Sequence, residues 1–166
     1  MKKNILGYTL GAIIASASFS SFAATSVEAD VAFHSASEFD ISWAPETGLN
    51  AGVNPSATKI GVLTVTHVSG PAAYADVTSP NFGPQQGSDG KVIFNGKDGI
   101  AGKTINVRIP RGNANINELW GKWRLKQDGG QIQAGGSQSI NLVLDGDQDI
   151  APGTYSATFN VVASAV

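Results

Sequence analysis

The sequence predicts an all-β protein, an antiparallel β-sandwich of immunoglobulin-like type, and three observations lead to this prediction. Beyond the first 23 residues, roughly seven to nine short segments rich in β-branched residues are separated by turn signals about every 8–15 residues. No stretch of the mature chain shows a convincing helical period of apolar residues. Cysteine is absent, so the fold must rest on burial and hydrogen bonds without disulfides.

The first 23 residues have the features of a secretory signal peptide. Lys2 and Lys3 form a basic head, Ile5–Ala17 is apolar, and Ser21 and Ala23 lie three and one positions before a predicted cleavage site. Removing the signal leaves nine basic residues against 13 acidic ones, so neither nucleic acid nor an anionic membrane is an expected partner. The predicted organisation is a signal peptide over 1–23, an N-terminal strand with its linker over 24–37, and one soluble sandwich domain over 38–166.

The first half of the domain contains three predicted strands. Glu38–Trp43 alternates apolar and polar residues, and Pro45 ends it because proline cannot donate to a ladder. Lys59–Val68 is the strongest β-forming stretch, and the Gly70-Pro71 pair closes it. Ala73–Thr78 is a weaker candidate and leads into a loop rich in glycine and proline.

The second half supplies the remaining strands, each bounded by glycine or acidic turn residues. The first two flank a glycine-containing turn, and the last two are joined by an acidic loop. In chain order the predicted strands are Lys91–Asn95, Lys103–Ile109, Leu119–Lys126, Ser139–Leu144 and Thr154–Val162.

A further alternating segment directly follows the signal peptide. Its apolar face consists of Val27, Ala29, Val31 and Phe33, with Ser26, Glu28, Asp30 and Ala32 between them. The polar residues 34–37 separate it from the domain. This segment is either an ordinary first strand of its own sandwich or a strand intended for another molecule.

Three parts of the chain resemble the structural subunits of chaperone–usher fimbriae, the surface fibres of Gram-negative bacteria. They are the alternating leader Ala24–Phe33 running into Phe39–Pro45, the strand Lys59–Val65, and the C-terminal Ile150–Val162, with its Gly-x-Tyr pattern. The sequence is most similar to the cysteine-free subunits of the F1-capsule and CS3 types.

The resemblance implies an incomplete immunoglobulin-like sandwich that lacks its last strand and is completed by a donor strand from a neighbouring subunit. The donor side chains would be Val27, Ala29, Val31 and Phe33, and the wall of the acceptor groove would include Tyr155, Ala157, Phe159 and Val161. The implied partners are identical subunits, a periplasmic chaperone, an outer-membrane usher and a host-cell receptor, with the chain displayed in a fimbria at the cell surface. The alternatives are a tip adhesin of the same pathway and a self-complete secreted sandwich that binds carbohydrate.

The densest aromatic and basic pattern lies in the predicted strand Leu119–Lys126. On one strand, Trp120, Lys122, Arg124 and Lys126 would share a face. This face is a candidate receptor patch because an aromatic ring can stack on a sugar and cations can hold acidic groups. The simpler interpretation is a solvated strand face in which lysine stems cover part of Trp120.

No pattern in the chain indicates catalysis or a cofactor. Asp145–Asp149 begins like a calcium loop, but Ile150 stands where the sixth position needs glycine and Ser156 where the twelfth needs glutamate. The two histidines, His34 and His67, lack zinc-ligand spacing and no nucleophile motif accompanies them. We therefore predict that the protein is not an enzyme and has no metal site.

Overall fold

The computed structural model describes residues 36–164, and the predicted signal peptide and donor segment lie outside this range. No helix in the described part is long and apolar enough to cross a membrane. Every regular element from 36 to 164 is a strand, as the sequence predicts. The strands are β1 Glu38–Pro45, β2 Gly52–Asn54, β3 Lys59–Ser69, β4 Tyr74–Thr78, β5 Lys91–Gly96, β6 Thr104–Arg108, β7 Ile116–Leu119, β8 Lys122–Leu125, β9 Ser137–Leu144, β10 Gln148–Ile150, β11 Tyr155–Ser156 and β12 Asn160–Ser164.

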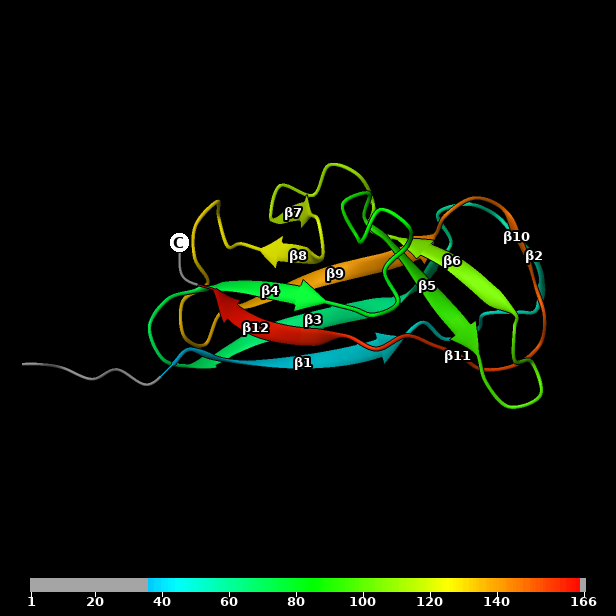
Figure 1. The fold of residues 1–166 in the computed structure, drawn as a ribbon, viewed down its shortest axis with the longest axis horizontal. Helices are drawn as coiled ribbons and strands as arrows, with labels where there is room; N and C mark the ends of the chain where they lie inside the picture. Colours follow the sequence, from blue (N-terminus) through cyan, green and yellow to red (C-terminus); the bar gives the residue numbers. More distant parts are fainter. Residues whose placement is uncertain (1–35, 165–166) are drawn as a thin grey trace, which may run out of the picture. The chain divides into compact units, whose positions relative to one another are not determined.

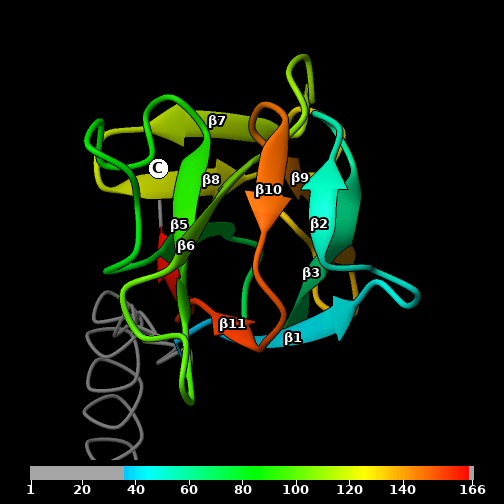
Figure 2. The same cartoon turned by 90° about the vertical axis from the view of Figure 1, so that its right-hand side faces the viewer.

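The strands form two main sheets in which every ladder is antiparallel (Figure 1). The larger has the order β1-β3-β9-β6-β5-β11 and the smaller has the order β12-β4-β8-β7. A short β10-β2 pair lies at the end of the domain that faces the viewer in Figure 2. This arrangement confirms the predicted antiparallel sandwich.

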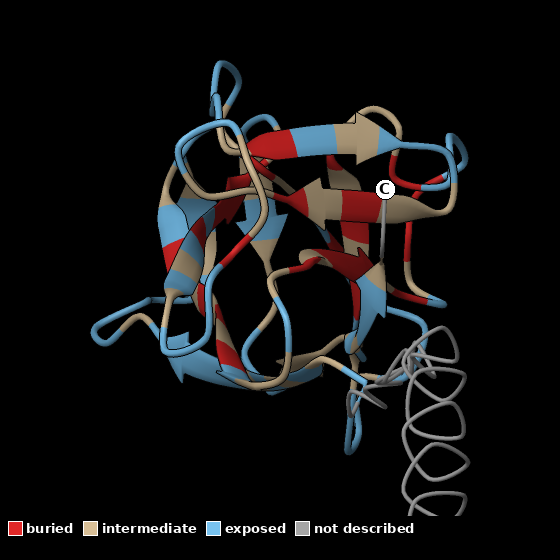
Figure 3. Cartoon of the chain, turned by 90° about the vertical axis from the view of Figure 1, so that its left-hand side faces the viewer, coloured by how far each residue is buried: buried red, intermediate tan, exposed pale blue. Residues whose placement is uncertain are grey.

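Alternation along the strands determines which side chains enter the core. In β3, Leu63, Val65 and His67 are buried while Thr64 and Thr66 between them are partly exposed. Figure 3, which colours the chain by burial, shows buried and more exposed residues following one another along the strands. Trp123 of β8 is fully buried, packs against Phe82 with ring centroids 4.7 Å apart, and donates its indole N–H to the carbonyl oxygen of Gly87 at 2.9 Å. A buried indole with a satisfied N–H anchors the middle of the sandwich.

Two predicted strands are wrong in extent. Leu119–Lys126 is not one strand, because the chain reverses at Trp120-Gly121 and β7 pairs with β8 as a hairpin. Gly121 adopts a φ of +79°, which glycine reaches without steric cost. Thr154–Val162 is also two strands: β11 pairs with β5 in the larger sheet and β12 pairs with β4 in the smaller. Alternation continues across both breaks, so periodicity alone hides them.

Candidate functional site

The two sheets each end in a strand with one unpaired edge, and these two strands lie side by side. Among the described residues, β1 pairs with β3 alone and β12 pairs with β4 alone. The strands run in opposite directions (Figure 1), and their Cα atoms come within 8 Å of each other. No ladder joins them. We call this line between β1 and the segment 157–163 the open seam.

The inward side chains along the open seam are apolar and only half-buried. Phe39 and Ile41 come from β1, while Ala157, Phe159 and Val161 come from the other side, and all five pack against the core. The ring of Phe159 lies 6.0 Å from Trp123 and 6.2 Å from Phe94, centroid to centroid. A further strand laid over the seam would therefore complete an existing core.

The bend that carries the chain from β11 to β12 is held by the loop after β4. The Ser79 hydroxyl donates to the carbonyl oxygen of Thr158 at 2.6 Å, and the Thr158 N–H donates to the Asn81 side-chain oxygen at 2.9 Å. Both polar backbone groups of Thr158 are thus satisfied where the chain leaves one sheet for the other. This bonding orients Ala157 and Phe159 toward the seam.

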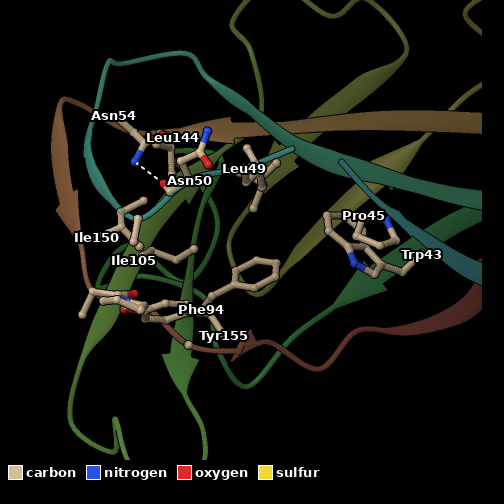
Figure 4. Close-up of a pocket in the computed structure, with 15 residues that line it drawn as sticks. Trp43, Pro45, Leu49, Asn50, Asn54, Phe94, Ile105, Leu144, Ile150 and Tyr155 are labelled. Atoms are coloured by element: carbon tan, nitrogen blue, oxygen red, sulfur yellow. Dashed lines mark hydrogen bonds between the residues drawn. The ribbon is translucent and has the colours of Figure 1, made fainter. Parts of the chain in front are cut away.

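An apolar cavity of about 410 Å³ lies at the end of the seam where β1 finishes. Trp43 and Pro45 of β1, Phe94 of β5 and Tyr155 of β11 line it together with Leu49 and Ile150 (Figure 4). The Tyr155 hydroxyl donates to the carbonyl oxygen of Ala151 at 3.0 Å, a return bond of the kind found in the tyrosine corner of immunoglobulin-like folds. We call this space the end cavity.

The absence of a side chain at Gly61 of β3 leaves room for the Trp43 indole beside the end cavity. Any Cβ at Gly61 would meet the indole ring of Trp43, so a side chain there would displace the ring. Trp43 is 37% exposed although its ring lies near Phe94, with centroids 5.9 Å apart. A large aromatic side chain left this open at the edge of a core is available to a partner.

One amide of the β1 strand is satisfied locally rather than by a partner strand. The N–H of Ile41 donates to the carboxylate of the preceding Asp40 at 2.9 Å. Side chains that bond backbone groups of their own strand, and charged residues on edge strands, both hinder unwanted pairing. At Ile41, the edge of β1 is therefore less open to an additional strand than a fully free amide would be.

The four predicted groove-wall residues lie in different places. Tyr155 is in β11 and lines the end cavity, Ala157 and Phe159 lie on the bend between the sheets, and Val161 is in β12. Sequence reasoning missed the opposite wall, formed by Phe39 and Ile41, although the alternation of Glu38–Trp43 marked these residues as one apolar face. It also missed the end cavity, because that space is assembled from strands distant in sequence.

The candidate receptor patch is divided by the hairpin. Trp120 lies in the turn and is 69% exposed, whereas the cations of Lys122 and Arg124 both contact the buried carboxylate of Asp76. The Lys122 Nζ lies 2.6 Å and the Arg124 Nε 2.8 Å from its oxygens. Arg124 also donates to the Ser164 hydroxyl of β12 and lies over the Tyr74 ring. These two cations are held internally, so the receptor patch stays a prediction that rests mainly on Trp120 and Lys126.

Opposing effects act on the Asp76 carboxyl. Burial raises its pKa, but hydrogen bonds and the positive charges of Arg124 and Lys122 together lower it more, and the resulting pKa is below the ordinary value. The carboxylate therefore stays ionised and links β4 to β8, while Arg124 links β8 to β12. This network fixes the outer side of the strand that borders the open seam.

The acidic loop that begins like a calcium loop contacts other parts of the protein. Asp145 contacts Lys91 at 2.9 Å and Arg108 at 3.4 Å, and Asp147 accepts a hydrogen bond from the Ser56 N–H at 2.7 Å. Within residues 36–164, no three acidic or histidine side chains come together as a metal site would require. Asp145 thus ties the loop to β5 and β6, and Asp147 ties it to the turn that contains Ser56.

The fold and the open seam define the class of structure: an immunoglobulin-like sandwich with one open side. No protein-family model and no curated protein sequence matches the chain. Among solved structures, the chain is similar to the SafD adhesin of Salmonella, with a TM-score of 0.62 and 18% identity over 77% of this chain and 88% of that chain. It is also similar to HdaB, the minor tip subunit of the Escherichia coli Hda pilus, with a TM-score of 0.58 and 17% identity over 76% and 82% of the two chains.

A third similar structure belongs to the AAF fimbriae of enteroaggregative Escherichia coli. It has a TM-score of 0.52 and 14% identity, and the match covers 77% of this chain and all of that chain. At these identities the comparisons establish a shared fold. The fold predicted from the sequence is therefore confirmed, and the solved proteins that share it include fimbrial subunits and an adhesin.

Proposed function

We propose that this chain is a structural subunit of a chaperone–usher fimbria or capsule-like fibre and polymerises by donor-strand exchange. Val27, Ala29, Val31 and Phe33 of one copy would fill the open seam of the next. The observation that carries the proposal is the open seam itself, where two unpaired strand edges border apolar side chains that the fold leaves half-buried. The named functions of the similar structures support the same role.

The end cavity suggests the direction of the donor strand. Phe33 is the largest donor side chain, and the cavity lies where β1 ends at Pro45. If Phe33 fills it, the donor runs parallel to β1 and antiparallel to β12, and the small Ala29 lies near the middle of the seam. The donor from Val27 to Phe33 would then have the same length as the part of β1 from Phe39 to Pro45, since each spans six residue steps, or about 20 Å.

The length of the linker argues for insertion into another copy. Five peptide units join Phe33 to Glu38, a reach of at most about 17 Å. In the proposed direction, a strand filling the seam of its own chain would have to return from Pro45 to Glu38, about 24 Å along β1. The linker is too short for this path, so the proposed geometry builds a polymer rather than a closed monomer.

The width of the seam bears on how insertion occurs. A strand paired on both sides needs its two neighbours to lie about 9.6 Å apart, whereas β1 and β12 come within 8 Å in places. The edges must therefore separate by roughly 2 Å or more as a donor enters. A chaperone that holds the seam open until an usher exchanges it for a donor would meet this need, and a free seam would invite aggregation.

A pair of substitutions in the full chain tests the proposal. Val31→Asp places a charge among the buried donor side chains, while Glu28→Gln changes the opposite face of the same strand. With the cognate secretion system present, we expect the first variant to be exported but to form no fibres by electron microscopy. The second should form fibres as the wild type does. Normal fibres from Val31→Asp would contradict the proposal.

The alternatives predict different patterns for the same assay. A tip adhesin uses its own seam as an acceptor but donates no strand, so Val31→Asp would be harmless while Ile41→Asp in β1 would remove it from the fibre. A self-complete carbohydrate-binding sandwich would be secreted as a monomer in every variant. A fibre subunit requires both the donor segment and the seam.

A further inference from the structure

The last residues of the linker are fastened to the turn that follows β3. The Ser37 hydroxyl donates to the carbonyl oxygen of Pro71 at 2.7 Å. Gly70 has a φ of +96°, and a Cβ there would lie 2.8 Å from the Cα of Ser37 and 3.0 Å from the carbonyl oxygen of Ala36. The linker backbone therefore lies directly against this turn, and only glycine at position 70 leaves room for it. We call residues 69–72 the linker turn.

This fastening shortens the tether that would join two copies. Three peptide units separate Phe33 from Ala36, a reach of at most about 11 Å. If Phe33 of one copy occupies the end cavity of the next, the linker turn of the first copy must come close to the mouth of that cavity. Packed β-layers lie about 10 Å apart, so a tether of this length brings the two domains to contact distance.

An exposed apolar surface borders the end cavity. Leu49 lines the cavity and is 47% exposed, and Val53 of β2 is 81% exposed. Gly52 and Asn54 are less exposed than Val53 between them, so the Val53 side chain points away from the domain. The Asn54 amide donates to the carbonyl oxygens of Asn50 and Gly52 at 3.0 and 2.8 Å, which braces this loop. We call Leu49 and Val53 the apolar rim.

The linker turn and the apolar rim lie at opposite ends of one domain. Figure 1 shows the β3–β4 turn at one end and β2 with β10 at the other. β3, which is 11 residues long, runs between the two ends, a length of roughly 33 Å. The two surfaces therefore cannot meet within one chain. They can meet head to tail between consecutive copies, and a contact of this kind can repeat along an open filament.

We infer that consecutive copies make a second contact, in which the linker turn of one copy packs on the apolar rim of the next. This inference rests on the proposed function, because donor-strand exchange is what brings the two surfaces together. Pro71 of the linker turn is exposed, and its apolar ring would cover Val53. Each junction would then have two attachments, the donor strand and this contact, and would resist the bending that a linker alone permits.

Cysteine cross-linking of assembled fibres tests the contact. The chain contains no cysteine, so Val53→Cys together with Pro71→Cys provides the only two thiols. A short bismaleimide should join consecutive copies, and after heating in detergent we expect a ladder of covalent oligomers on electrophoresis. Trp120→Cys with Pro71→Cys is the matched control. Trp120 is also exposed, but its β7–β8 hairpin lies between the two ends of the domain (Figure 1), so this pair should give no ladder.

The outcomes separate the contact from the proposed function. Fibres of the Val53→Cys and Pro71→Cys variant that give no ladder would overturn the inference and leave donor-strand exchange standing. Failure of the wild-type chain to form fibres would contradict the proposed function, and the second contact with it.

Fibre stiffness provides a second measurement that needs no cysteine. Val53→Ser changes neither the donor segment nor the open seam, so fibres should form in the wild-type amount. Their persistence length by electron microscopy should fall to about half, because one of the two attachments between neighbouring copies is weakened. Trp120→Ser should leave the persistence length unchanged. Val53→Ser fibres as stiff as the wild type would overturn the inference.

Discussion

The core around Trp123 and the open seam contain the same kinds of side chain but differ in how many strands cover them. Trp123 has strands on both sides in its own sheet and is fully buried, with its indole N–H bonded. Phe39 comes from a strand with one unpaired edge, Phe159 from the bend that leads into the other such strand, and both remain half-buried. The difference shows that the seam is a stretch of core lacking one strand rather than a surface of special composition.

The largest expected loss of stability comes from the closed part of the sandwich. Trp123→Ala removes the central buried ring and its bond to Gly87, and it should lower the free energy of unfolding by about 3–5 kcal/mol. Denaturant unfolding of the free chain measures this. Trp120→Ala is the matched control, because that ring is exposed and its loss should change stability by less than about 0.5 kcal/mol.

The control variant Trp120→Ala also tests the receptor patch. If Trp120 contacts a host receptor, Trp120→Ala should reduce cell binding although its stability is unchanged. Unchanged cell binding would show that the Trp120 ring takes no part in adhesion. An equal loss of stability in the two tryptophan variants would remove the distinction between core and surface on which the comparison rests.

An intermediate and pH-dependent effect is expected at Asp76, which ties the closed sheet to β12. Because its pKa is lower in the folded chain, Asp76 contributes stability above its ordinary pKa and loses this contribution as pH falls through the folded value. Asp76→Asn should cost about 1–3 kcal/mol at pH 7. The difference in the free energy of unfolding between the variant and the wild type should become smaller below about pH 4.

Unfolding experiments from pH 2 to 7 would follow that narrowing. The exposed Asp149 provides a control, since Asp149→Asn should leave the dependence of the unfolding free energy on pH nearly unchanged. If the loss of unfolding free energy in Asp76→Asn did not change with pH, the ion pairs with Lys122 and Arg124 would not stabilise the sheet.

The smallest stability effect, with a large functional one, is expected at the seam. Ile41→Ser removes a half-buried side chain and should lower the free energy of unfolding of the free chain by about 1 kcal/mol. It should nevertheless abolish or strongly slow fibre formation, because in the proposed assembly Ile41 would become fully buried once a donor strand covers it. Ser42→Ala, on the outer face of the same strand, should assemble normally. Assembly of Ile41→Ser at the wild-type rate would contradict the seam as an acceptor.

Much of the fold was predictable because alternation reports directly on which side chains enter a core. Six predicted strands, from Glu38–Trp43 to Ser139–Leu144, correspond to single strands of the structure with small differences at their ends. The hairpin at Trp120-Gly121 was not recognised, since the pattern of apolar residues continues through its turn. Likewise, the apolar residues from Tyr155 to Val161 remain in phase while the chain changes sheets, and only the bonds to Thr158 locate the bend.

The sequence by itself determined the all-β class, the apolar faces of the strands and the presence of an extra alternating segment before the domain. These follow from local periodicity, which each segment carries independently of its neighbours. Only the tertiary structure decided that β1 and β12 lie side by side without pairing, that an end cavity lies beside Trp43, and that Asp76 holds two cations of the expected receptor patch, Lys122 and Arg124. These features depend on strand order and on contacts between residues far apart in the chain, which local periodicity does not encode.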